Sequence, residues 1–120
     1  MEKSDVTWKV FGMYMLIIIL LLFSNASYGQ LQLVVFNASW NDANKVEWAW
    51  ELEDVQTQAY IDISKDTKLQ KKHKIAVIPT IIIFKDGEEV ERFQADISFS
   101  IKATKKELQE VINEQLMSDF

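Results

Sequence analysis

The chain has 120 residues and a formal net charge of -5, and 48% of its residues are hydrophobic. This hydrophobic share, together with few glycines and prolines, predicts one compact domain and excludes a disordered or repetitive chain. The acidic balance argues against a nucleic-acid-binding domain, which needs a basic surface to neutralise phosphates. We therefore expect no nucleic acid among its partners.

The first part of the chain has the pattern of a secretory signal peptide. Lys3 and Lys9 precede an apolar run over residues 10–23, and a polar stretch with small residues follows. As a helix, the run would reach about 21 Å, short of the roughly 30 Å hydrocarbon core of a membrane. We predict a signal peptide over residues 1–29 and an exported domain, periplasmic or secreted, over residues 30–120. An uncleaved anchor is the alternative, and membrane contact is expected only through it.

Strand and helix patterns alternate along the next part of the chain. Residues 31–36 form a mostly apolar, β-branched run that is typical of a strand buried on both faces. Residues 41–54 are helical in composition, with Asn41 or Asp42 as the expected cap. Residues 58–63 alternate between polar and apolar positions, which predicts a second strand.

The second half of the chain predicts a helix, a hairpin and a last helix. The short helix is expected over residues 66–72, with the aspartate at its start as the cap. Residues 80–93 hold two apolar-rich runs separated by an Asp-Gly pair, which tolerates the positive φ of a tight hairpin turn. Thr104 and Glu107 form a capping box that opens the last helix.

The predicted order of elements defines a fold class. It runs strand, helix, strand, helix, hairpin, helix. A right-handed crossover between the first two strands, followed by an antiparallel hairpin, gives a mixed four-stranded sheet. We therefore predict an α/β domain with helices on both faces of this sheet.

Residues 71–93, KKHKIAVIPTIIIFKDGEEVERF, resemble the thioredoxin family, and the resemblance extends over residues 31–116. That family typically has a lysine-rich short helix, Ile-Pro-Thr, a β-branched strand, Lys-Asp-Gly and a second strand. The resemblance implies a thioredoxin-like fold with a cis peptide bond before Pro79. Full-length thioredoxins usually carry another strand and helix before this region, and these are expected to be missing here. A sheet edge exposed in this way could be shared in a homodimer.

The resemblance also aligns residues 40–45, WNDANK, with the Trp-Cys-Gly-Pro-Cys-Lys motif of thioredoxins. Asn41 and Asn44 stand at the degenerate redox positions, and Val35 stands where the family commonly buries an acidic residue. Thiol–disulfide exchange needs a thiolate and a second thiol, and an asparagine amide can replace neither. Because the chain contains no cysteine, dithiol chemistry is not possible, and we expect neither catalytic residues nor a cofactor.

The family's recognition surface is retained in the sequence. The resemblance implies that Trp40, Ile78, Pro79 and Thr80 form a shallow apolar groove that binds an extended protein segment by strand-like pairing. The main hypothesis is therefore an exported, redox-inactive peptide-binding module. Two alternatives stay open: a thioredoxin-family oxidoreductase by descent whose activity has lapsed, and a structural or self-associating subunit.

The histidine and the tryptophans are the remaining candidates for a functional role. His73 is the only histidine, and it is expected on an exposed, lysine-rich helix end. A zinc site with one histidine and no cysteine would need several carboxylates, so we predict no metal site. Trp48 and Trp50 lie about 200° apart on a helix, so one of them is expected near the rim of the core. There it could contact a partner or cover part of the sheet.

Overall fold

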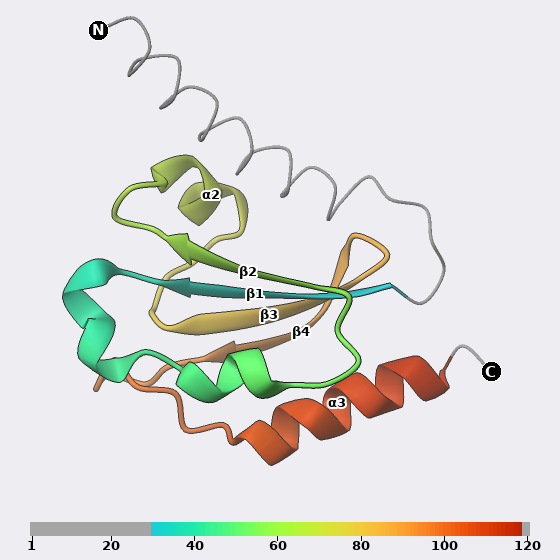
Figure 1. Ribbon diagram of the computed structural model, residues 1–120. Coiled ribbons are helices and arrows are strands. Elements are labelled where there is room, and N and C mark those ends of the chain that lie inside the picture. Colours follow the sequence, from blue (N-terminus) through green and yellow to red (C-terminus); the bar gives the residue numbers. More distant parts are fainter. Residues whose placement is uncertain (1–29, 119–120) are drawn as a thin grey trace, which may run out of the picture.

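The computed structural model describes residues 30–118, which form one sheet with helices on both faces (Figure 1). The strands lie in the order β2-β1-β3-β4, with β1 parallel to β2 and the other neighbours antiparallel. The predicted mixed four-stranded sheet is confirmed. The elements in chain order are β1 (Leu31–Asn37), η1 (Ser39–Asn44), η2 (Glu47–Glu51), β2 (Thr57–Asp62), α2 (Thr67–Lys72), β3 (Thr80–Lys85), β4 (Glu88–Gln94) and α3 (Lys105–Met117).

The predicted signal peptide or anchor, residues 1–29, lies outside the described residues. Within residues 30–118, no helix is both long and apolar enough to cross a membrane. The described sheet has β2 and β4 as its two edges and β1 and β3 at its centre.

Strand β1 carries the core on both of its faces. All seven of its residues are buried, because it lies between β2 and β3 and is covered above and below. On one face, Val34 and Phe36 pack with Leu69 of α2. On the other face, the apolar odd-numbered residues of β1 pack with Ala49 of η2 and with Leu108 and Ile112 of α3. The continuous apolar run in the sequence therefore reflects a strand with no exposed face.

The first helical segment differs from the predicted one. In place of one α-helix over residues 41–54 there are two short 3₁₀ helices, separated by extended backbone at Lys45 (φ -63°, ψ 149°). About half of these residues are alanine, lysine, glutamate or leucine, which favour the α-helix, so local propensity does not explain the break. Tertiary contacts override it, among them the bond from the Asn41 amide to the Phe99 carbonyl oxygen at 3.1 Å. The expected cap by Asn41 or Asp42 is also wrong. The cap position is Ala38, which makes no side-chain capping bond.

The predicted cap of α2 and the predicted hairpin turn are confirmed, and α3 begins with the Thr104 half of the predicted capping box. Asp66 accepts a hydrogen bond from the Leu69 N–H at 3.0 Å, and Thr104 accepts one from the Glu107 N–H at 3.2 Å. The Asp-Gly turn of the hairpin takes positive φ at both residues, 52° and 86°. Short-range sequence signals therefore fix the beginnings of α2 and α3 and the turn between β3 and β4.

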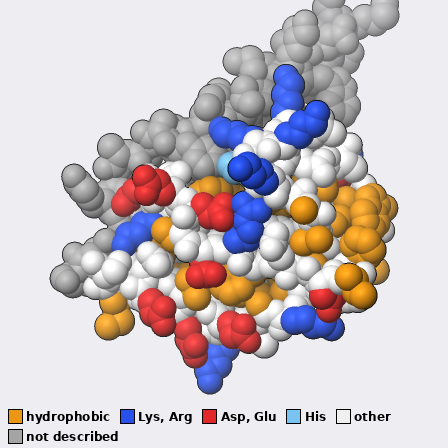
Figure 2. Space-filling view, turned by 180° about the vertical axis from the view of Figure 1, so that it is seen from behind, with side chains coloured by type: hydrophobic (Ala, Val, Ile, Leu, Met, Phe, Trp, Pro, Cys, Tyr) orange, Lys and Arg blue, Asp and Glu red, His pale blue; other side chains and the backbone are white. Residues whose placement is uncertain are grey.

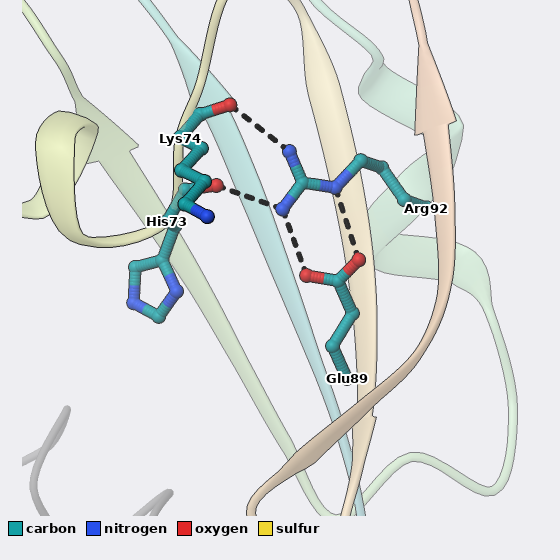
Figure 3. A network of polar contacts seen from close by, with 4 residues as sticks. All are labelled: His73, Lys74, Glu89 and Arg92. Carbon is teal, nitrogen blue, oxygen red and sulfur yellow. Dashed lines mark hydrogen bonds and ion pairs between the residues drawn. The ribbon is translucent and has the colours of Figure 1, made fainter.

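Basic side chains surround the single histidine on one face of the molecule (Figure 2). The guanidinium of Arg92, on β4, donates to the carbonyl oxygens of His73 at 2.7 Å and Lys74 at 3.2 Å. It also donates twice to the Glu89 carboxylate, at 3.0 and 2.8 Å (Figure 3). The last carbonyls of a helix lack partners within the helix, so this cation stabilises the end of α2.

The side chain of His73 is half-buried, not exposed as predicted. Its ring centre lies 5.5 Å from that of Phe36 and 5.6 Å from that of Phe84. Burial lowers the pKa of His73, and the positive charges of Lys72 and Arg92 lower it further. The neutral imidazole is therefore part of the packing between α2 and the sheet.

We expect His73 to make the stability of the fold depend on pH. Its pKa is lower in the folded chain than the usual value of about 6.5, so the folded state binds fewer protons than the unfolded state. The stabilisation is fully present above about pH 6.5 and is lost as the pH falls toward the folded pKa. His73→Gln should weaken this dependence, measured by denaturant unfolding between about pH 7.5 and 5. Identical pH profiles for both proteins would contradict the expected shift.

Candidate functional site

The four residues of the predicted groove come from two segments that meet at one end of the sheet. Trp40 lies in η1, directly after β1, and Thr80 begins β3 opposite Phe36 of β1. The Ile78–Pro79 peptide bond is cis, as the resemblance implies. Hydrophobic side chains gather at the right-hand end of Figure 2, which is the end where η1 lies in Figure 1.

Only one of the four side chains is presented to solvent. Trp40 is 65% exposed, whereas Ile78, Pro79 and Thr80 are buried. The Thr80 hydroxyl donates to the Val77 carbonyl oxygen at 2.7 Å, so it is already engaged within the chain. Any contribution of this loop to binding must therefore come from its backbone.

The backbone N–H and carbonyl oxygen of Ile78 are available for hydrogen bonds. In the described part of the chain, neither its N–H nor its carbonyl oxygen has a partner, while the neighbouring Pro79 carbonyl accepts from the Ala95 N–H at 3.0 Å. Backbone groups without a partner inside the chain can pair with water or with a partner chain. One donor and one acceptor on the same residue are what a neighbouring strand pairs with.

A loop that the sequence analysis missed enlarges the exposed surface around Trp40. Phe99, between β4 and α3, is 44% exposed, and its ring meets that of Trp40 edge-on with 5.3 Å between the ring centres. Ile97, in the same loop, is almost fully exposed. The sequence offered one signal for this surface, which is the pair of apolar residues Ile97 and Phe99 in a short segment after the predicted hairpin. We call Trp40, Ile97 and Phe99 the apolar end surface.

Hydrogen bonds between asparagine side chains occupy the place of the redox pair. The Asn44 amide donates to the Asn41 side-chain oxygen at 2.9 Å, so the two degenerate positions are in direct contact. The Asn41 amide donates to the side-chain oxygen of Asn37 at 3.0 Å and to the carbonyl of Phe99 at 3.1 Å. Asn41 is buried, and it joins β1, η1 and the Phe99 loop. These bonds are structural, because an amide offers neither a nucleophile nor a titrating proton.

The surroundings of this network hold neither the family's buried acid nor a group of metal-ligating side chains in the described part of the chain. Val35, at the position of the family's buried acid, is itself buried in an apolar cluster. Across residues 30–118, no three His, Asp or Glu side chains lie close enough together to hold a metal ion. The described site is therefore an apolar surface with spare backbone hydrogen-bonding groups.

Comparison with solved structures gives several matches. The X-ray structure of Fasciola hepatica thioredoxin is 32% identical, with a TM-score of 0.52, and the match covers 73% of this chain and 83% of that one. A mutant thioredoxin from Halobacterium salinarum NRC-1 is 21% identical, with a TM-score of 0.53 and coverages of 72% and 75%. Oxidised thioredoxin from Plasmodium falciparum is 17% identical, with a TM-score of 0.54 and coverages of 81% and 88%. No protein-family model and no curated protein matches the chain.

We expect Asn41→Ala to destabilise the fold by about 1–3 kcal/mol, because it leaves buried acceptors without a donor. Asn44→Ala is the matched control, since it removes a single bond from an exposed residue and should cost about 0.5–1 kcal/mol. Denaturant unfolding of the two variants measures the difference. Equal losses would show that the bonds from Asn41 to Asn37 and Phe99 do not stabilise the site.

Proposed function

Because this chain belongs to the thioredoxin family, we propose that it serves as a redox-inactive member that binds an extended segment of another protein. It is not a thiol–disulfide oxidoreductase, because it contains no cysteine. The observation that carries the binding proposal is the spare backbone donor and acceptor of Ile78 beside the exposed Trp40. Together they supply directional pairing and apolar contact at one place.

The proposed binding mode follows from these groups. A segment in extended conformation would exchange backbone hydrogen bonds with Ile78 and rest its side chains on the apolar end surface. Tryptophan supplies a large apolar contact area with few rotatable bonds, which makes Trp40 the expected anchor. With so few pairing groups and no covalent link, the affinity should be modest, at a Kd on the order of micromolar or weaker.

The cellular setting and the self-association remain parts of the proposal. The N-terminal pattern over residues 1–29 supports export, to a periplasmic or extracellular compartment.

The edge position of β2, which pairs only with β1 in the described sheet, supports a homodimer as a second candidate function. Sedimentation across a concentration series tests that candidate, and a monomer at every concentration would exclude it.

We expect the full chain to reduce insulin disulfides no faster than dithiothreitol does alone, because it has no thiol to donate electrons. The double variant Asn41→Cys and Asn44→Cys should regain a measurable rate, since the two side chains already touch. It should remain slower than a thioredoxin with its own motif, because Val35 supplies no base. Insulin precipitation and free-thiol titration measure the reduction rate of the unmodified chain and of the double variant. Turnover by the cysteine-free chain would overturn the assignment as redox-inactive.

The binding proposal predicts position-dependent capture of partners. A photoreactive residue at Ser39, which is exposed beside Trp40, should crosslink to a defined set of proteins in cells. The same probe at Glu110, exposed on α3, is the control position. Trp40→Ser, added to the Ser39 probe, should reduce capture several-fold without changing the thermal unfolding midpoint, because the ring is largely exposed. Capture that is the same at both positions, or insensitive to Trp40→Ser, would contradict the proposal.

A further inference from the structure

A cavity of about 410 Å³ lies where the η1–η2 segment faces the edge strand β2. Val35 and Val46, both buried, form part of its apolar lining. Trp50 and Tyr60 line it as well and are 44% and 36% exposed. Tyr60 pairs with Val35 between β2 and β1, so the aromatic ring belongs to the open edge of the sheet. The volume falls within the range of about 300–1,000 Å³ that is usual for small-ligand sites.

Two carboxylates line the same cavity and share one cation of the chain. The Lys45 ammonium lies 3.8 Å from the nearer Asp42 oxygen and 3.6 Å from the nearer Glu47 oxygen. These separations exceed the roughly 2.7–2.9 Å of a strong charge-assisted hydrogen bond. All three side chains are exposed, so the two ion pairs hold Lys45 only weakly. The spacing of the carboxylates nevertheless suits a single positive charge between them.

The charged groups that line the cavity are two carboxylates and the one ammonium of Lys45, so negative charge is in excess by one. Burial raises the pKa of Tyr60, and the negative charges of Asp62 and Asp42 raise it further. A negative potential disfavours a phenolate and favours a cation at the same place. Aromatic faces also attract cations, best when a tryptophan or tyrosine ring lies within about 6 Å of the charge.

We propose that this cavity binds an organic cation carried on an apolar stem, of the kind presented by an arginine or lysine side chain of a protein partner. The apolar stem would contact Val35 and Val46, and the charge would lie between Asp42 and Glu47 in place of the Lys45 ammonium. The open edge of β2 lets the backbone of an extended partner lie alongside Tyr60. This site is separate from the apolar end surface, and it does not depend on the proposed function there.

The direct test is an NMR titration of the full chain with an acetylated, amidated pentapeptide that has a central arginine. The indole N–H signal of Trp50 should shift to saturation, while that of Trp40 stays in place. The same peptide with central norleucine keeps the apolar stem but lacks the charge. It should bind about tenfold more weakly, or not measurably. Equal binding of the two peptides would overturn the proposal.

Charge variants separate a binding site from a surface ion pair. Glu47→Gln should weaken binding of the arginine peptide about twofold to fivefold, because it removes one of two exposed carboxylates. Lys45→Gln should strengthen binding, because it removes the competing cation. Lys102→Gln breaks an exposed ion pair with Asp96 elsewhere and should leave the affinity unchanged. No saturable Trp50 shift in either the unmodified chain or Lys45→Gln would overturn the proposal.

A small organic cation distinguishes a free ligand from a side chain of a protein partner. Butylguanidinium presents the same charge and stem without a peptide backbone. Binding as tight as that of the arginine peptide would assign the site to free organic cations, and weaker binding would assign part of the affinity to the edge of β2. Equal affinity of the two probes would therefore overturn the assignment to a protein partner, and failure of both probes would exclude a cation site. The Trp40→Ser variant should bind either probe unchanged, so this test is distinguishable from that of the apolar end surface.

Discussion

The burial of β1 on both faces is the constraint on which the rest of the structure depends. Because the strand has neighbours on both edges and helices on both faces, strand pairing and apolar contacts together fix its position and register. The chain must then leave the sheet just after Asn37, which places Trp40 and Asn41 at that end. The pairing of Phe36 with Thr80 brings the Pro79 loop to the same end. The candidate site is therefore a consequence of where the central strands begin and end.

The asparagine network places fixed hydrogen bonds where a thioredoxin has its redox pair. Where the resemblance implies a pair of cysteines that alternate between dithiol and disulfide, this chain has side-chain amides with fixed partners. Amide hydrogen bonds do not respond to the reduction potential of the compartment. The shape of the surface around Trp40 should therefore be the same in oxidising and reducing surroundings. A constant shape suits a surface that binds a partner, whereas a redox enzyme without its cysteines would lose its function.

The sequence predicted the parts of the fold that have local causes. The apolar run of β1, the Asp-Gly turn and the caps at Asp66 and Thr104 each depend on residues within a few positions of one another. The errors arise from distant contacts. Asn41 bonds to Phe99, 58 positions away, and this bond uses the side chain that was expected to cap a helix. The packing of His73 against Phe36 and Phe84 and the burial of Thr80 likewise depend on how distant elements are placed against these strands, which local patterns do not specify. The exposed part of the site was therefore only partly predictable.

The contacts of Arg92 have a consequence for motion in the loop that leads to Ile78. Helix α2 has six residues and one buried apolar side chain, which is too little to hold it in place alone. Local opening of α2 has to break the bonds from Arg92 to both carbonyl oxygens, so its amides should exchange with solvent as one cooperative unit. The segment from His73 to Ile78 begins at this anchored point. A partner strand would therefore meet a loop that is already ordered, and little conformational entropy would be lost on binding.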